Sequence, residues 1–126
     1  MVSLSITNKT KGTLPRVPFA AIANDIMPRG SEISLAFVEP RVSKKLNSTL
    51  RGKDYPANIL TFPFSKNSGE IIICPHEAKR MAPDFELSFR HMIILLFIHG
   101  LLHLKGVPHG ATMDRLEARL LKRHTG

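Results

Sequence analysis

The chain has 126 residues, 43% of them hydrophobic, and its 18 Lys and Arg residues outnumber its 10 Asp and Glu residues, which gives a net charge of +8. This length fits one domain, residues 1–126, and the single cysteine, Cys74, excludes an internal disulfide and favours a reducing, cytoplasmic setting. The N-terminal residues lack the pattern of a secretory signal, and the longest apolar run, residues 92–98, is too short to span a bilayer, so we expect no membrane segment.

The first half of the chain alternates between strand and helix patterns. In chain order, we expect a strand at residues 2–6, a helix at 17–27, a strand at 32–38 and a helix at 40–50. In the last of these helices, Val42, Leu46 and Leu50 recur at helical spacing. This half of the chain is therefore expected to mix both kinds of element.

The second half is expected to add two strands and three helical segments. In chain order these are strands at 58–62 and 70–74, a short helical piece at 76–81, a long helix ending near Lys105 and an amphipathic helix at 114–123. The polar residues 63–69 suit a hairpin or a wide loop, and Asp84 can cap the long helix. Together the elements predict an α+β fold: a single domain with a small mixed four-stranded sheet and about five helices, packed around a central apolar helix.

The positive charge is spread along the chain, with nine Lys and Arg residues before Asp54 and nine after it. Such an excess favours a polyanionic partner, with nucleic acid as the first candidate, although a solvated basic surface is an equally simple explanation. One Tyr and no Trp leave little material for stacking bases. Phosphate contacts would therefore carry most of the affinity for a nucleic acid.

Three histidines, His99, His103 and His109, lie in the run HGLLHLKGVPH. Two imidazoles four residues apart on a helix point the same way, and Gly106 can end that helix so that the third ring swings back toward them. The central helix then carries three neutral nitrogen donors with a fourth position left for water, as in catalytic zinc centres. Zinc, one ion per chain, is the favoured metal, and another divalent ion such as Ni²⁺ fits the same donors. The alternative is three ordinary histidines on a buried helix.

The residue after the first histidine bears on the type of reaction. The spacing H-x-x-x-H-x-x-G-x-x-H is that of the metzincin proteases, which carry a Glu at this place as the general base. Here the residue is Gly100, which cannot accept a proton. Peptide hydrolysis by that route is therefore disfavoured, and a relic peptidase is kept only as an alternative.

Three blocks of the chain form recognisable patterns: residues 99–109 (HGLLHLKGVPH), residues 50–63 (LRGKDYPANILTFP) and residues 69–75 (GEIIICP). They resemble the YbeY family of bacterial endoribonucleases and ribosomal RNA maturation factors, with its patterns H-G-x-L-H-L-x-G-x-D-H, an Arg and an Asp before T-N-V-L-S-F-P, and G-D-I-x-I-C. The chain departs from them at Pro108, where the family usually has Asp, and at Ala57, where it usually has Thr.

The resemblance implies metal-dependent cleavage of RNA in ribosomal RNA maturation, at the 3′ end of 16S rRNA, and a part in ribosome biogenesis. The partners would be RNA, above all ribosomal RNA, and the ribosomal small subunit or its assembly factors. Zinc would polarise a phosphoryl oxygen or lower the pKa of a bound water to about 7. A non-catalytic ribosome-assembly or RNA-binding factor with a structural metal is the alternative.

The resemblance also places a catalytic arginine at Arg51, whose planar charged group suits a phosphate in the transition state. An exposed Arg at the end of a helix is the simpler explanation. Asp54 is expected either to orient Arg51 or an imidazole, or only to form a turn. Lys53 and Lys105 either hold flanking phosphates or face solvent.

Overall fold

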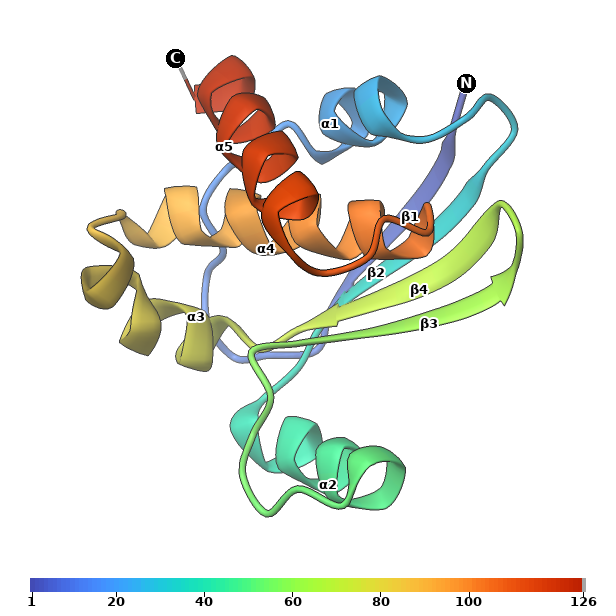
Figure 1. The fold of residues 1–126 in the computed structure, drawn as a ribbon. Helices are drawn as coiled ribbons and strands as arrows, with labels where there is room; N and C mark the ends of the chain where they lie inside the picture. Colours follow the sequence, from blue (N-terminus) through green and yellow to red (C-terminus); the bar gives the residue numbers. More distant parts are fainter. Residues whose placement is uncertain (126) are drawn as a thin grey trace.

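The computed structural model describes residues 1–125 and contains one four-stranded sheet with five α-helices around it (Figure 1). The strands are β1 (Ser3–Asn8), β2 (Glu32–Phe37), β3 (Ile59–Ser65) and β4 (Ser68–Ile73). The helices are α1 (Phe19–Ile26), α2 (Pro40–Arg51), α3 (Pro75–Met81), α4 (Phe89–Leu104) and α5 (Ala111–Thr125), with a 3₁₀ turn, η1 (Ala82–Phe85), between α3 and α4. This arrangement confirms the predicted single-domain α+β fold.

The sheet has the strand order β1-β2-β4-β3. The pairs β1–β2 and β2–β4 are parallel, whereas β3 runs antiparallel to β4 at the edge. Of the two alternatives for residues 63–69, the structure has the hairpin and not the wide loop, because β3 continues to Ser65 and the antiparallel β4 begins at Ser68. The pairing is irregular between Pro63 and Ser65, and an edge strand tolerates a proline because it need not donate a hydrogen bond on its open side.

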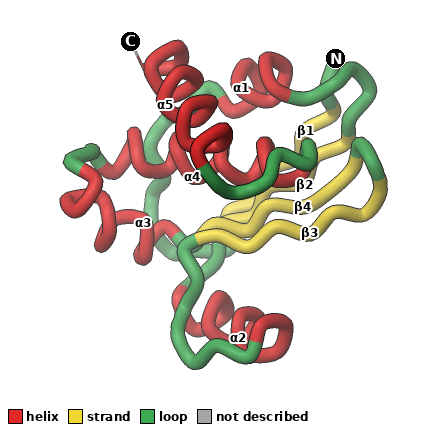
Figure 2. The backbone as a smooth tube through the Cα atoms, viewed as in Figure 1, coloured by secondary structure: helices red, strands yellow, loops and turns green. Residues whose placement is uncertain are grey.

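The helices cover the two faces of the sheet unequally, and Figure 2 shows α1, α4 and α5 together on one side, with α2 apart from them. Alternate residues of β2 and β4 point to the two faces. Leu35 and Ile71 face the large core with α4, whereas Ala36 and Ile72 face a smaller cluster with Leu46 of α2. The main core therefore lies between the sheet and α4.

Helix α4 is apolar on all sides and lies at the centre of the fold. It contacts α1, α3, α5, β3 and β4, and nine of its residues are buried. Within residues 1–125 no single helix is long and apolar enough to cross a bilayer; residues 75–85 and 89–104 reach that length and composition only as a pair bent by 104°.

The start of α4 differs from the prediction. Asp84 lies in η1, and the cap is Ser88, whose side chain accepts a hydrogen bond from the backbone N–H of His91 at 3.1 Å. Between them Glu86 adopts a left-handed conformation with φ of 56°, which breaks the chain direction before the helix begins. The predicted cap, Asp84, is wrong because hydrophobic periodicity alone does not locate the change of chain direction at Glu86.

Helix α2 packs Leu46 against the sheet, but its fully buried residues are polar. Val42 and Leu50 are exposed, whereas Ser43 and Asn47 are buried. The hydroxyl of Ser43 donates to the carbonyl of Ala57 at 2.7 Å, and the amide nitrogen of Asn47 donates to the carbonyl of Tyr55 at 2.8 Å. These bonds tie the loop between α2 and β3 to the helix.

An ion-pair cluster joins the C-terminal end of α5 to α1. Asp25 accepts hydrogen bonds from Arg123 at 2.8 and 3.0 Å and pairs with Nε2 of His124 at 2.9 Å. Burial alone would raise the pKa of Asp25, but the hydrogen bonds and charges of His124 and Arg123 outweigh it and hold this pKa below its ordinary value. The charged form of Asp25 is therefore favoured in the folded protein.

We predict that Asp25→Asn lowers the free energy of unfolding by about 1 kcal/mol at neutral pH, because a partly exposed ion pair is worth about that much. A carboxyl with a lowered pKa in the folded state stabilises fully above its unfolded-state value, here 3.8, and loses this effect as the pH falls through the folded-state value. Urea unfolding of both proteins should thus show a difference that shrinks below pH 3.8.

The control for this measurement is Glu32→Gln, which removes an exposed carboxylate from the start of β2 with the same change in net charge. We expect the Gln variant to unfold like the wild type. Equal stabilities of the two variants at neutral pH would contradict the assignment of a stabilising role to the α1–α5 cluster.

Candidate functional site

The three predicted histidines line one pocket of about 510 Å³. His99 and His103 lie one turn apart on α4, and His109 lies in the loop that follows. The ring centroids are 5.1 Å apart for His99 and His109 and 5.4 Å apart for His103 and His109. Two imidazole ligands of one tetrahedral zinc ion place their centroids about 5 Å apart, so the three rings are gathered at a spacing that suits one ion.

The turn after α4 brings His109 back toward the helix. The backbone N–H of Gly106 donates to the carbonyl of His103, and that of Val107 donates to the carbonyl of Leu102, each at 3.0 Å. This pair of bonds is the Schellman motif, and it needs the positive φ of 96° that Gly106 adopts. The predicted helix end at Gly106 is confirmed, and its geometry is what directs the third ring into the pocket.

Each of the two helix-borne imidazoles has a partner on its Nδ1 atom. Nδ1 of His99 meets a carboxylate oxygen of Glu117 on α5, and Nδ1 of His103 lies 2.6 Å from the hydroxyl of Thr61 on β3. A ring that donates from Nδ1 keeps its lone pair on Nε2. The Glu117 carboxylate only accepts, so it leaves Nε2 of His99 free to bind a metal, and the Thr61 hydroxyl leaves Nε2 of His103 free in the same way when it accepts from Nδ1.

Glu117 and Thr61 were not predicted from the sequence. Glu117 is four residues after Met113 and three before Leu120, both buried, so it is a carboxylate on the inward side of an amphipathic helix. Its side chain is only 16% exposed. An acidic residue within an apolar stripe is the signal that could have found it. Thr61 carries no such signal, since Thr is common in strands.

The electrostatic environment favours neutral imidazole at the centre of the site. Burial lowers the pKa of His103, and the neighbouring rings of His109 and His99 lower it further. Neutral imidazole is the form that binds a metal. His103 is therefore held in the protonation state that a ligand requires.

The donor set fits zinc or nickel, although its atoms are not yet focused on one point. Among residues 1–125, no three His, Cys, Asp or Glu side chains already stand in a metal-coordinating arrangement. His99 is partly buried, whereas His103 and His109 are exposed, and His109 lies on a loop with Gly110 at φ of 138°.

Arg51 is the last residue of α2 and lines the same pocket as the histidines. Gly52, with φ of 67°, ends the helix directly after it. The structure thus unites the predicted arginine and the predicted ligands, from separate elements, in one cavity. Asp54 instead lies 3.6 Å from Lys44 and is almost fully exposed, which matches the turn interpretation and not an orienting role.

The other candidate cations and histidines lie elsewhere. Lys53 and Lys105 are exposed and do not line the histidine pocket. His76 lies beside Glu77 on α3, and His124 belongs to the α1–α5 cluster. In the described part of the chain the candidate site therefore consists of the three clustered histidines, Arg51 and the partners of the imidazoles.

A family model described as Endoribonuclease YbeY matches residues 5–125. The chain belongs to the YbeY family. It is 42% identical over 67 residues to the Endoribonuclease YbeY of Thermotoga neapolitana (52% of this chain, 45% of that one), and 38% identical over 100 residues to that of Rubrobacter xylanophilus (75% and 66%). The Endoribonuclease YbeY of Rhizobium etli is 36% identical over 104 residues (71% and 61%). The matches cover about half to two thirds of the length of these relatives.

A solved structure has a similar fold. The chain resembles the solution structure of TM1509 from Thermotoga maritima with a TM-score of 0.67 and 25% sequence identity, over 97% of this chain and 87% of that one. The resemblance to YbeY proteins that the three sequence blocks indicate is thereby confirmed at the level of family and fold.

Gly100, the YbeY-like residue where a metzincin has its glutamate, faces the sheet and not the pocket. A Cβ atom at this position would lie 3.0 Å from Cδ1 of Ile71 and 3.1 Å from Cδ1 of Ile59. Such distances are tighter than ordinary packing, so the side chains of Ile71 and Ile59 would have to move by a few tenths of an ångström to admit a Cβ. The place of the metzincin base is therefore a tightly packed contact between α4 and the sheet.

We predict that Gly100→Ala destabilises the fold by about 1–3 kcal/mol, the usual cost of overpacking a core. Urea unfolding monitored by circular dichroism measures the change. The matched control is Gly12→Ala, where a Cβ meets no described atom within 4 Å and the stability should change by less than about 0.5 kcal/mol. Equal unfolding midpoints for the two variants would show that α4 does not approach the sheet as closely as described.

We also predict that Glu117→Ala weakens zinc binding about 10- to 100-fold, because it removes the group that orients His99. Thr61→Val should weaken it less, since a hydroxyl orients an imidazole less strongly than a carboxylate does. Zinc titration in competition with a chromophoric chelator measures both. The control is Asp114→Asn, an exposed carboxylate on the same helix, and an affinity of Glu117→Ala equal to that of the control would contradict the role of Glu117.

Proposed function

We propose that this chain is a metal-dependent endoribonuclease that acts in ribosomal RNA maturation, including the 3′ end of 16S rRNA. The observation that carries the proposal is the convergence of three histidines and Arg51 on one pocket. Membership in the YbeY family supports RNA as the substrate class, and the net charge of +8 suits a polyanion.

The metal in this proposal is one zinc ion held by His99, His103 and His109, with nickel as the other ion that the donors suit. When bound, such an ion supplies Lewis acidity at a phosphoryl group. The protein's own part is to fix the rings: Glu117 and Thr61 hold two of them by their Nδ1 atoms. This arrangement keeps the two rings on α4 in place before a substrate arrives.

The role proposed for Arg51 is to hold the scissile phosphate. A guanidinium can donate two parallel hydrogen bonds to phosphate oxygens and stays charged at any physiological pH. In the described part of the chain no acidic residue lines the histidine pocket, so nothing there competes with the phosphate for this cation. Charge that accumulates on the phosphoryl oxygens in the transition state is stabilised by this donor.

The proposed setting is the cytoplasm, with the ribosomal small subunit or its assembly factors as further partners. The only cysteine, Cys74, is buried at 1% exposure, and burial raises the pKa of its thiol. It behaves as a small apolar core residue, as predicted, and a free buried thiol suits a reducing compartment.

We predict that His103→Ala loses both bound zinc and RNA cleavage, whereas Arg51→Ala keeps zinc and lowers kcat about 10²- to 10³-fold, the typical loss of one transition-state donor. Metal content by mass spectrometry and cleavage of a ribosomal RNA fragment are measured on the same preparations. Arg41→Ala, an exposed arginine at the other end of α2, is the control and should keep both properties.

Two outcomes would contradict the proposal. Wild-type protein that binds no divalent metal would remove the basis of the mechanism. Cleavage that survives in His103→Ala would assign the activity to a contaminant. Metal-bound protein that binds RNA and never cleaves it would favour the second candidate, a non-catalytic RNA-binding assembly factor, which the basic net charge also suits.

A further inference from the structure

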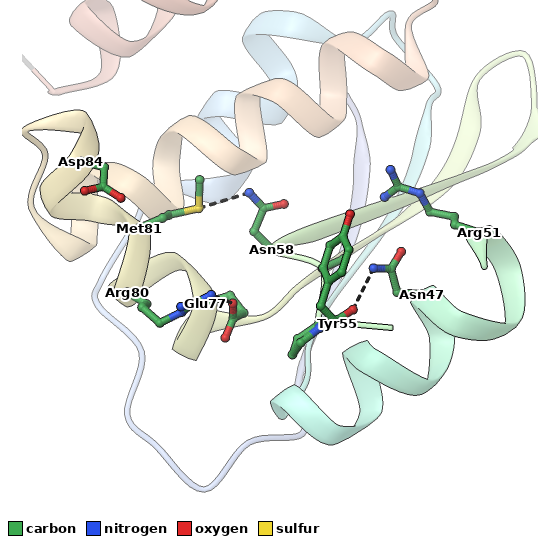
Figure 3. A pocket seen from close by; sticks show the side chains of 10 residues that line it. Asn47, Arg51, Tyr55, Asn58, Glu77, Arg80, Met81 and Asp84 are labelled. Carbon is green, nitrogen blue, oxygen red and sulfur yellow. Dashed lines mark hydrogen bonds and ion pairs between the residues drawn. The ribbon is translucent and has the colours of Figure 1, made fainter. Parts of the chain in front are cut away.

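A second pocket adjoins the histidine pocket and has no part in the chemistry described so far (Figure 3). Its volume is about 390 Å³, within the size range of small-ligand sites. Arg51 and Asn58 line both cavities, so the two are neighbours that share one wall. We call the second cavity the Tyr55 pocket, after the only tyrosine of the chain, which also lines it.

Asn47 lines the Tyr55 pocket and has one amide atom that lacks a partner. Its residue is 1% exposed, and its nitrogen is used in the hydrogen bond to the carbonyl of Tyr55. Its oxygen, Oδ1, is buried and has no hydrogen-bond partner among residues 1–125. Figure 3 shows this oxygen on the side of the amide nearer to Arg51, with the nitrogen toward Tyr55. A buried acceptor left unsatisfied costs free energy, and because this oxygen is closed off from solvent, a ligand reaches it only if the amide moves.

The charges of the Tyr55 pocket balance one another. Arg51 and Arg80 supply two cations, and Glu77 and Asp84 supply two carboxylates. Arg80 lies 2.9 Å from Glu77. Burial alone would raise the pKa of Glu77, but the bonds and charges of Arg80 and His76 hold it below its ordinary value, so this pair is ionised. Arg80 is thus paired, and Arg51 is the cation assigned above to the scissile phosphate, so a neutral, polar ligand suits the rest of this cavity better than a second phosphate does.

The remaining walls of the Tyr55 pocket present the aromatic face of Tyr55 and the side-chain amide of Asn58, which makes only a weak hydrogen bond. Tyr55 is 55% exposed, and Figure 3 shows its ring standing in the pocket between Asn58 and Asn47. The side-chain nitrogen of Asn58 donates only to the sulfur of Met81, at 3.1 Å, and a thioether is a weak acceptor. An aromatic face beside amide donors and acceptors is the combination that recognises a nucleobase.

We propose that the Tyr55 pocket binds the nucleobase of the nucleotide next to the scissile phosphate, stacked on Tyr55 and hydrogen-bonded on its edge by Asn58, while Asn47 holds the backbone of Tyr55 in place. The inference rests on the proposed function, because it takes the phosphate to lie at Arg51. Arg51 then links the two sites: its guanidinium holds the phosphate while the base enters the adjoining cavity. The base site fixes the position of the chain relative to the histidines.

The first test measures RNA affinity without cleavage, in the His103→Ala background. In that background Tyr55→Ala should weaken the binding of a short RNA oligonucleotide about 5- to 100-fold, the usual effect of losing one base–aromatic stack. Tyr55→Phe keeps the ring and should bind nearly as the parent does. Phe64→Ala, which removes another exposed aromatic residue from β3, is the matched control and should bind as the parent does.

The second test asks whether the base is the group recognised. An oligonucleotide with an abasic residue placed next to the cleaved bond should bind the parent protein as weakly as Tyr55→Ala binds the intact oligonucleotide. Combining both changes should cause no further loss, because they remove the same contact. Additive losses would place the base elsewhere and overturn the proposal.

Nucleoside 5′-monophosphates, tested beside inorganic phosphate, separate base from phosphate recognition. Magnetic resonance should show shifts of the Asn47 and Asn58 side-chain amides with a nucleoside monophosphate and none with phosphate alone. Equal shifts with both, or none with either, would overturn the base site.

If the wild type cleaves RNA while Tyr55→Ala binds as tightly as its parent, the base site fails and the nuclease stands. If the wild type does not cleave, the nuclease fails, and the binding comparison still decides the base site.

Discussion

The close packing of α4 on the sheet at Gly100 is the constraint on which the rest of the structure depends. A residue without a Cβ lets the helix backbone approach Ile59 and Ile71, so β3 passes directly beside the helix. That proximity is what brings the hydroxyl of Thr61 within 2.6 Å of His103. The glycine at the place of the protease-type base thus also lies where the sheet comes close enough for Thr61 to contact His103.

Much of this arrangement follows from local pattern. The spacing of His99 and His103 on an apolar helix, followed by Gly106, is enough to predict three rings on one side of a turn, because helix geometry and the left-handed cap are local properties. The four strands and five helices also follow from periodicity and turn residues. The role of Arg51 was predicted from the resemblance to the YbeY family and not from spacing, and in the structure Arg51 lines the histidine pocket.

What the sequence could not predict depends on distant partners. Asn47 and Ser43 are buried because they donate hydrogen bonds to carbonyls of the loop that follows α2. The hydrophobic spacing of α2 alone therefore suggests a buried position for Val42, which is exposed. Glu117 acquires its meaning only when α5 packs on α4, 18 residues from the imidazole it contacts. Capping choices and strand ends are likewise decided by tertiary contacts that one sequence does not reveal.

The carboxylate that contacts His99 belongs to Glu117, which follows all three histidines of the pocket in the sequence. On a polypeptide made from its N-terminus, α5 emerges after all three imidazoles, and its far end is fastened to α1 through Asp25. A nascent chain that has been made only as far as His109 contains all three histidines but lacks the carboxylate of Glu117 that contacts His99. The contact between Glu117 and His99 can therefore form only after α5 has been synthesised and has packed on α4.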